Sequence, residues 1–135
     1  MKKELKCIML VDDDENDNFY HLREIQKNNS AIRVIEETKS IDALEYLMAN
    51  KDNKDLLPNL IFLDIHMPNM DGWMFLDSFR ELDKELQEQV MVVMLSTSKN
   101  PEDIEKSREY SCIAEFISKP LTRQIMERIA KKYFL

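Results

Sequence analysis

Short apolar segments recur along the chain between longer polar ones. Five of them are rich in branched residues and too short for helices, as is typical of β-strands; they cover residues 7–11, 32–35, 60–63, 90–95 and 113–117. Three of the five are continuous apolar runs, which is the pattern of strands buried on both faces. The chain is therefore predicted to build a sheet with a buried centre.

The segments between the strands carry apolar residues at helical spacing. Their stripes lie at Phe19, Leu22 and Ile25; at Ile41, Leu44, Leu47 and Met48; at Phe75, Phe79 and Leu82; and at Ile125, Ile129 and Tyr133. The repeated alternation of strand and helix predicts a parallel sheet with helices on both faces and right-handed crossovers. The polar residues 50–58 predict the one long loop.

A further helix is predicted over residues 100–110. Asn100 is a candidate N-cap, Pro101 suits the first turn, and the acids Glu102 and Asp103 follow near the positive end of the helix dipole. The apolar stripe of this segment is poor, with Ile104 as its main anchor. We therefore expect a helix that is held only loosely against the sheet.

Length and charge limit the classes of protein. The 135 residues fit one compact domain, 1–135, with no output domain beside it. The formal net charge of −7, from 19 basic and 26 acidic residues, argues against a binder of the nucleic-acid backbone, which needs a basic face. The acidic excess is compatible with a cluster of carboxylates around a cation.

The amino-terminal sequence carries no targeting signal. The apolar run at residues 7–11 is too short for a signal-peptide core or a membrane span. Cys7 and Cys112 both lie in apolar stretches, as reduced core cysteines do. We expect a cytoplasmic protein that does not bind a membrane.

Polar residues with chemical potential follow the predicted strands. In an open parallel sheet, ligands bind beyond the carboxyl ends of the strands, so these residues should meet at one edge. They are Asp12, Asp13 and Asp14 after the first strand, Asp64 after the third, Ser96 and Thr97 after the fourth, and Ser118, Lys119 and Pro120 after the fifth. The sequence thus predicts acids, hydroxyls and a lysine in one site.

This set of side chains favours phosphoryl chemistry on a carboxylate. Several carboxylates at one edge repel one another unless a cation neutralises them, and Mg²⁺ suits oxygen ligands together with a phosphate oxygen. A carboxylate is also a competent nucleophile toward phosphorus. A metal ion and a lysine can stabilise the charge on the transferring group, and a hydroxyl can donate a hydrogen bond to it.

Four motifs resemble those of the response-regulator receiver family. They are Leu-Val-Asp-Asp at 10–13, Leu-Asp-Ile-His-Met-Pro-Asn-Met-Asp-Gly at 63–72, Met-Leu-Ser at 94–96 and Phe-Ile-Ser-Lys-Pro at 116–120. They occur in the family's order, and the chain is similar to the single-domain bacterial chemotaxis receiver. The resemblance implies an α/β fold of the flavodoxin-like (βα)5 type, a three-layer sandwich with a parallel five-stranded sheet of order 2-1-3-4-5.

The resemblance also implies roles for the acidic residues. Asp64 would be the phosphoryl acceptor and a metal ligand. Asp13 would bind Mg²⁺ directly, with Asp12 assisting through water, and the backbone carbonyl of His66 would complete the protein ligands. Asp14 is interpreted as a surface or capping acid.

Further roles follow for residues after the last two strands. The resemblance implies that Ser96 donates to the phosphoryl group, that Lys119 pairs with it, and that the Lys119–Pro120 peptide bond is cis. Phe116 occupies the place of the family's switch aromatic, although an aromatic in a strand is often simply part of the core. In the switch hypothesis, phosphate draws Ser96 inward, Phe116 fills the vacated space, and the helix over 100–110 shifts.

Two residues are candidates for setting the lifetime of the phosphate. His66 lies two residues after Asp64, and Ser98 lies two residues after Ser96. An imidazole at this place would orient or obstruct the attacking water, unless only the backbone of His66 matters. The two side chains would then set the rate of hydrolysis jointly.

The function implied by the resemblance is that of a stand-alone response regulator. Its partners would be a sensor histidine kinase or a histidine phosphotransfer protein, which supplies the phosphoryl group, and an unknown downstream protein that reads the phosphorylated state. The chain would catalyse transfer to its own Asp64 and later hydrolysis without being a conventional enzyme.

Two alternatives belong to other classes of protein. One is an unphosphorylated interaction module that keeps the receiver fold; Mg²⁺-dependent modification of Asp64 separates it from the switch. The other is an aspartate-nucleophile phosphatase of the haloacid type, which needs a second acid two residues after the nucleophile, where this chain has His66. Turnover of an external phosphate ester would favour the phosphatase.

Overall fold

The architecture was determined from a computed structural model that describes residues 2–135. Strands and helices alternate along the chain, with one additional helix before the fourth strand. The strands are β1 (Cys7–Val11), β2 (Arg33–Glu37), β3 (Leu60–Leu63), β4 (Met91–Ser96) and β5 (Ile113–Ser118). The helices are α1 (Glu15–Asn28), α2 (Ser40–Ala49), α3 (Gly72–Phe79), α4 (Lys84–Gln89), α5 (Pro101–Ser107) and α6 (Arg123–Tyr133).

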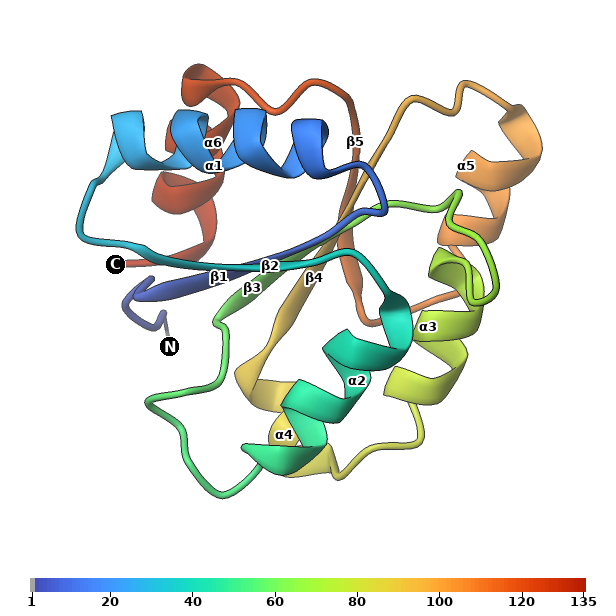
Figure 1. Ribbon diagram of the computed structural model, residues 1–135, viewed down its shortest axis with the longest axis horizontal. Helices are drawn as coiled ribbons and strands as arrows, with labels where there is room; N and C mark the ends of the chain where they lie inside the picture. The colour runs from blue at the N-terminus through green and yellow to red at the C-terminus, as the bar shows by residue number, and fades with distance from the viewer. Residues whose placement is uncertain (1) are drawn as a thin grey trace.

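The five strands form one parallel sheet of order β2-β1-β3-β4-β5 (Figure 1). This confirms the predicted fold, including the strand order. The three continuous apolar runs are the three central strands β1, β3 and β4, and they are almost wholly buried. The outer strands β2 and β5 are half exposed, which explains why their sequences mix apolar and charged residues.

Helices cover both faces of the sheet, so the molecule has three layers (Figure 1). Helices α1 and α6 lie on one face, where Ile25, Met126 and Ile129 pack with inward residues of the central strands. Helices α2, α3 and α4 lie on the other face, where Leu47 and Phe75 belong to the second apolar core. Because the central strands alternate their side chains between the two cores, each strand needs apolar residues at every position.

Some sequence-based details are corrected by the structure. Helix α4 was not predicted, because Leu86 is its one buried residue and its sequence carries no apolar stripe. Three residues placed in the apolar stripes are exposed to solvent: Phe19, Ile41 and Met48. Helical spacing identified the correct general face but overestimated its width.

The helix predicted over residues 100–110 is shorter than expected and is anchored differently. It ends at Ser107, with Asn100 as N-cap accepting a hydrogen bond from the Glu102 N–H. Ile104, the expected anchor, is exposed. The apolar contact comes instead from Tyr110, which lies three residues beyond the helix and is 6% exposed. The helix itself buries only Ser107, so the expectation of a loosely held helix agrees with its packing.

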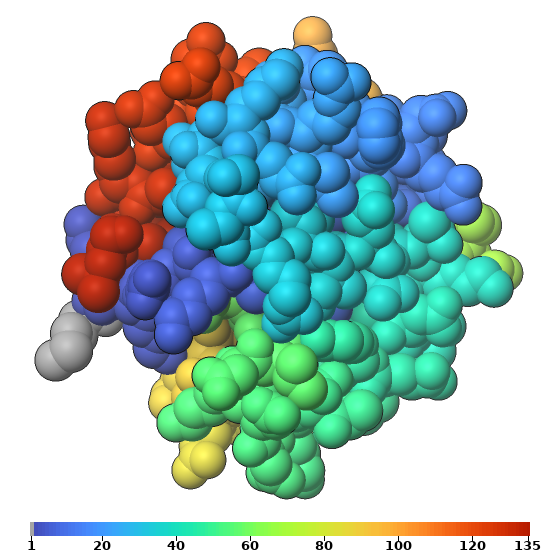
Figure 2. Space-filling view, turned by 60° about the vertical axis from the view of Figure 1, so that its left-hand side comes forward, coloured from blue at the N-terminus to red at the C-terminus, as the bar shows by residue number. Residues whose placement is uncertain are grey.

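The edge strand β2 lies at the surface between two helices. Figure 2 shows the face on which α1 and α2 flank β2, with the loop at residues 50–58 below them. That loop contains no helix or strand, as predicted. Near the other end of the sheet, Lys3 and Phe134 form a parallel bridge. Within residues 2–135, no helix combines the length and the apolar character that crossing a membrane requires.

Candidate functional site

The ends of the strands deliver the predicted site residues to one edge of the sheet. The N–H of Asp12 donates to the carbonyl of Glu37 at 3.1 Å, and that of Asp64 donates to the carbonyl of Val11 at 2.9 Å. The N–H of Lys119 donates to the carbonyl of Ser96, also at 2.9 Å. The ladder therefore continues one residue beyond each strand and fixes the backbone of the site.

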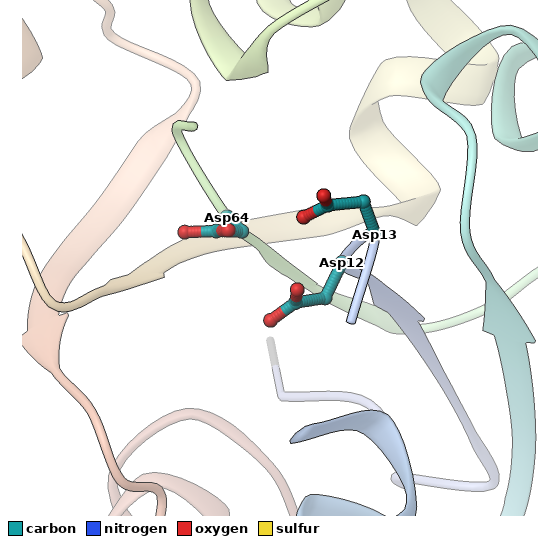
Figure 3. Close-up of side chains that lie close together, drawn as sticks. All are labelled: Asp12, Asp13 and Asp64. Carbon is teal, nitrogen blue, oxygen red and sulfur yellow. The ribbon is translucent and has the colours of Figure 1, made fainter. Parts of the chain in front are cut away.

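Three carboxylates converge at this edge (Figure 3). One oxygen each of Asp12, Asp13 and Asp64 can be chosen so that all three lie within 4.8 Å of one another. Asp12 and Asp64 are buried and Asp13 is exposed, so the cluster opens to solvent on one side. Asp14 does not join it: its side chain caps α1 by accepting a hydrogen bond of 2.9 Å from the Asn16 N–H. The sequence-based interpretation of Asp14 agrees with this geometry.

Lys119 brings a positive charge to the cluster. Its Nζ lies 2.5 Å from Oδ2 of Asp12, 2.9 Å from Oδ2 of Asp17 and 3.7 Å from Oδ2 of Asp64. Lys119 and Asp64 therefore form an ion pair, but their atoms are too far apart for a hydrogen bond. Asp17 was not singled out in the sequence, because only the first turn of α1 brings it to the lysine. The Lys119–Pro120 peptide bond that follows is cis.

The electrostatics of the site show an excess of negative charge. Burial, opposed by the charge of Lys119 and reinforced by that of Asp12, raises the pKa of Asp64 to about 6. Burial likewise raises the pKa of Asp12, against the hydrogen bond from Lys119. Burial disfavours the charge on Lys119 itself, but its bonds to Asp12 and Asp17 outweigh this and raise its pKa. The one ammonium of Lys119 faces several carboxylates and does not neutralise them all.

The donor set fits a divalent cation with oxygen preference. Asp12, Asp13 and Asp64 supply carboxylate oxygens within reach of a common centre, and the exposed side of the cluster leaves room for water or a phosphate oxygen. A cation here would stabilise the charged form of Asp64, whose pKa is raised chiefly by burial. The acidic cluster is thus a candidate metal site.

The loop after β3 brings His66 close to the start of α5. Its side chain is 66% exposed, and its Nε2 lies 3.7 Å from Oδ2 of Asp103, in the first turn of α5. The same Asp103 oxygen accepts a hydrogen bond of 2.5 Å from the hydroxyl of Ser98. The two candidate residues for phosphate lifetime are therefore linked through Asp103, whose part in the site the sequence did not reveal.

Ser96 and Phe116 occupy neighbouring strands at the edge of the site. Ser96 ends β4, is fully buried, and its Oγ accepts a hydrogen bond of 3.1 Å from the Ser98 N–H. Phe116 of β5 is opposite Met94 of β4 and is partly buried against the core that contains α3. The aromatic ring thus has solvent on one side and core on the other.

An aromatic contact joins the start of α3 to the segment after α5. The rings of Trp73, at the start of α3, and Tyr110 stack with their centroids 5.5 Å apart. The hydroxyl of Tyr110 donates to Oδ1 of Asp77 at 2.9 Å, and the guanidinium of Arg80 lies 4.3 Å from the centre of the Tyr110 ring. This contact ties α5 to α3 and partly replaces the apolar stripe that α5 lacks.

Comparison with known proteins agrees with this architecture. The chain is 29% identical over 125 residues to the sensor histidine kinase CheAY of Helicobacter pylori, a match that covers 93% of this chain. The chain spans only 15% of the length of that kinase.

Solved structures with the same fold include two response regulators. The two-component response regulator of Cytophaga hutchinsonii superimposes with a TM-score of 0.87 at 25% identity, over 97% of this chain and 98% of the other. The Mn²⁺-bound form of response regulator Rcp1 superimposes with a TM-score of 0.71 at 24% identity, over 96% and 94%. The profile of the response regulator receiver domain matches residues 8–131. The chain therefore belongs to the response regulator receiver domain family of two-component signalling.

Proposed function

We propose that this chain is a stand-alone response regulator that accepts a phosphoryl group on Asp64. The donor is a sensor histidine kinase or a histidine phosphotransfer protein, and the phosphorylated chain acts in the cytoplasm through contact with a downstream protein. The observation that carries the proposal is the position of Asp64. Its carboxylate lies beside two further carboxylates, with which it can hold a cation, and 3.7 Å from the ammonium of Lys119.

The reaction is an in-line displacement at phosphorus. A carboxylate oxygen of Asp64 forms a bond to phosphorus while the bond between phosphorus and the donor imidazole nitrogen breaks, and the leaving imidazole takes up a proton. Lys119 pairs with a phosphoryl oxygen, and the Ser96 hydroxyl donates to another. In the later hydrolysis, water attacks phosphorus, inorganic phosphate leaves, and the Asp64 carboxylate is restored.

The metal in this proposal is Mg²⁺, held by Asp12, Asp13, Asp64 and the backbone carbonyl of His66. When bound, it supplies positive charge that stabilises the transferring phosphoryl group. A bound cation would lower the raised pKa of Asp64 and so favour the ionised carboxylate that acts as the nucleophile. The Mn²⁺ bound by the related Rcp1 is consistent with such a site in this fold.

The output is a change of surface at α5 and β5. Phosphate draws the Ser96 hydroxyl inward, Phe116 turns into the space, and α5 moves with the segment that ends at Tyr110. Support comes from the weak anchoring of α5, which buries only Ser107, and from the half-buried state of Phe116. Such an element can adopt two arrangements that a local charge biases.

The proposal is tested by intact mass spectrometry after incubation with Mg²⁺ and acetyl phosphate. The expected result is the gain of one phosphoryl group that requires Mg²⁺ and is lost in Asp64→Asn. Asp14→Asn is the matched control: it removes a neighbouring carboxylate, yet asparagine caps a helix equally well. It should be phosphorylated like the wild type.

The same experiment distinguishes the alternatives. If the wild type gains no mass and does not bind beryllofluoride, a mimic of the phosphoryl group, the chain is an interaction module with a receiver fold. Steady hydrolysis of an external phosphate ester would instead indicate a phosphatase. The absence of an acid at position 66, where the exposed His66 stands, argues against that activity.

A further inference from the structure

Lys119 forms ion pairs both with acids of the site and with Asp17, which lies outside the family motifs. Besides Asp12, its Nζ is bound by Asp17 of α1, at 2.9 Å, whereas Asp64 lies at 3.7 Å. The side chain of Asp17 is 41% exposed, compared with 10% for those of Lys119 and Asp64. Asp17 therefore holds the lysine from the rim of the site.

The contacts of Lys119 with Asp12 and Asp17 compete with its contact to a group on Asp64. In the unphosphorylated protein, two of its three N–H groups are directed to Asp12 and Asp17. Its Nζ lies 3.7 Å from Oδ2 of Asp64, so a hydrogen bond to a group bound there would draw the ammonium away from α1. Asp17 cannot follow, because it stands in the first turn of a helix whose start is fixed by the Asp14 cap.

Binding of a cation sharpens this competition. A metal ion held by Asp12 would compete with Lys119, because the same carboxylate accepts a hydrogen bond from the lysine. Asp17 takes no part in the metal cluster, so its hold on the lysine persists when the metal is bound. The neighbouring His21 adds no positive charge that would compete with Lys119 for Asp17, because burial lowers its pKa to about 4.

We propose that Asp17 is a positioning residue that keeps Lys119 on the α1 side of the site until Asp64 carries a phosphoryl group. The inference rests on the proposed function, since it assigns Lys119 to the phosphoryl group. Asp17 thereby lowers the affinity of the site for that group and limits the fraction of the protein in the active arrangement.

The size of the effect follows from the exposure of Asp17. Pairs between a partly exposed carboxylate and an ammonium contribute little, so loss of the charge should change the equilibrium by about two- to five-fold. Removing Asp17 releases Lys119 and should tighten the binding of a phosphoryl mimic. If Asp17 instead supported the active arrangement, its removal would weaken the binding of the mimic.

The test is the dissociation constant of beryllofluoride at saturating Mg²⁺, followed by ¹⁹F NMR for four proteins: wild type, Asp17→Asn, Lys119→Met and the double variant. Asp17→Asn is expected to bind about two- to five-fold more tightly than wild type. In the Lys119→Met background, the same change is expected to have no effect, because the cycle isolates the coupling of the two residues. Asp14→Asn should bind like the wild type, and Asp17→Glu should restore wild-type affinity.

Other results would contradict either the positioning role of Asp17 or the proposed function. Equal tightening in both backgrounds would assign the effect to charge at a distance, and weaker or unchanged binding by Asp17→Asn would remove the positioning role. Both results leave the proposed function intact. Failure of the wild type to bind beryllofluoride would overturn the proposed function, and this inference with it.

Discussion

A Cβ atom on Gly72 would lie 2.6 Å from the carbonyl oxygen of Asp64. It would also lie 2.9 Å from the Cα of Ile65, whose carbonyl accepts a 2.8 Å hydrogen bond from the Gly72 N–H. The start of α3 is thus pressed against the end of β3, where the site begins. Both of these atoms belong to the backbone and cannot rotate out of the way as a side chain could. The single glycine of the chain is therefore required here for steric reasons.

Gly72→Ala is therefore expected to destabilise the protein and to disturb the site together. Overpacking against backbone should lower the free energy of unfolding by about 1–3 kcal/mol. Because the displaced backbone carries Asp64, the affinity for Mg²⁺ should fall as well. Urea denaturation and Mg²⁺ titration measure the two effects. The control is Met74→Ala on the exposed face of α3, which should leave both nearly unchanged; an equally stable Gly72→Ala protein would contradict the close contact.

Ionisation of Asp64 should cost stability when no metal is present. Since its pKa is raised from 3.8 to about 6, the folded protein binds a proton that the unfolded chain has lost between these values. Stability therefore decreases as the pH rises from about 4 to about 6, by on the order of 2 kcal/mol once screening at the open side is allowed for. In EDTA, wild type should match Asp64→Asn near pH 4 and be less stable above pH 6.

The comparison with Asp64→Asn removes the opposing contribution of His21. Its lowered pKa makes stability rise with pH over a similar range, in both proteins alike. Mg²⁺ should then stabilise the wild type at pH 7 and have little effect on Asp64→Asn. Parallel stability curves for the two proteins between pH 4 and pH 7 would show that Asp64 is ionised without cost.

The elements predicted most reliably from the sequence are those surrounded by apolar side chains on both faces. The bounds of β1 and β3 agree with the predicted segments, because a central strand between two apolar cores shows an uninterrupted apolar run. Strand β2 extends two residues further than predicted, through Glu36 and Glu37, since an edge strand pairs on one side only and tolerates charge. Helix α4, with one buried residue, leaves almost no trace in the pattern.

The candidate site was predictable where it follows directly from strand ends. Asp12, Asp64 and Lys119 each continue a strand of the sheet, so topology alone brings them together. Asp17 and Asp103 were missed for a physical reason: each contacts the site through a side chain in the first turn of a helix. Asp17 bonds to Lys119, far away in the sequence, and Asp103 links the nearby Ser98 to the distant His66. Such contacts depend on helix orientation, which spacing does not encode.

Asp103 connects α5 to the loops that flank the site, and its removal should shorten the lifetime of the phosphate. A charge-assisted hydrogen bond such as that from Ser98 contributes about 1 kcal/mol or more, so Asp103→Ala should loosen the loop and admit water more easily. We expect the dephosphorylation rate to rise a few-fold, measured by loss of the phosphorylated mass over time. Glu102→Ala, an exposed acid of the same turn, should keep the wild-type rate.

The role of His66 and Ser98 is tested by the same measurement. Exchanging these two residues changes both partners of the Asp103 carboxylate. An unchanged rate of dephosphorylation would eliminate the hypothesis that they set the phosphate lifetime. It would leave His66 with its backbone role alone.

Phe116→Ala should separate phosphorylation from its structural consequence. Trp73 stacks on Tyr110, just beyond α5, so a shift of that segment on phosphorylation should alter the fluorescence of this single tryptophan. Phe116 touches the core but none of the ion pairs of the site, so the variant should still gain the phosphoryl mass. Its fluorescence response should be lost or strongly reduced, because no ring is available to fill the space that Ser96 vacates. A full response in Phe116→Ala would show that α5 moves without the aromatic side chain, and the switch would then have to run through the Ser98–Asp103 contact instead.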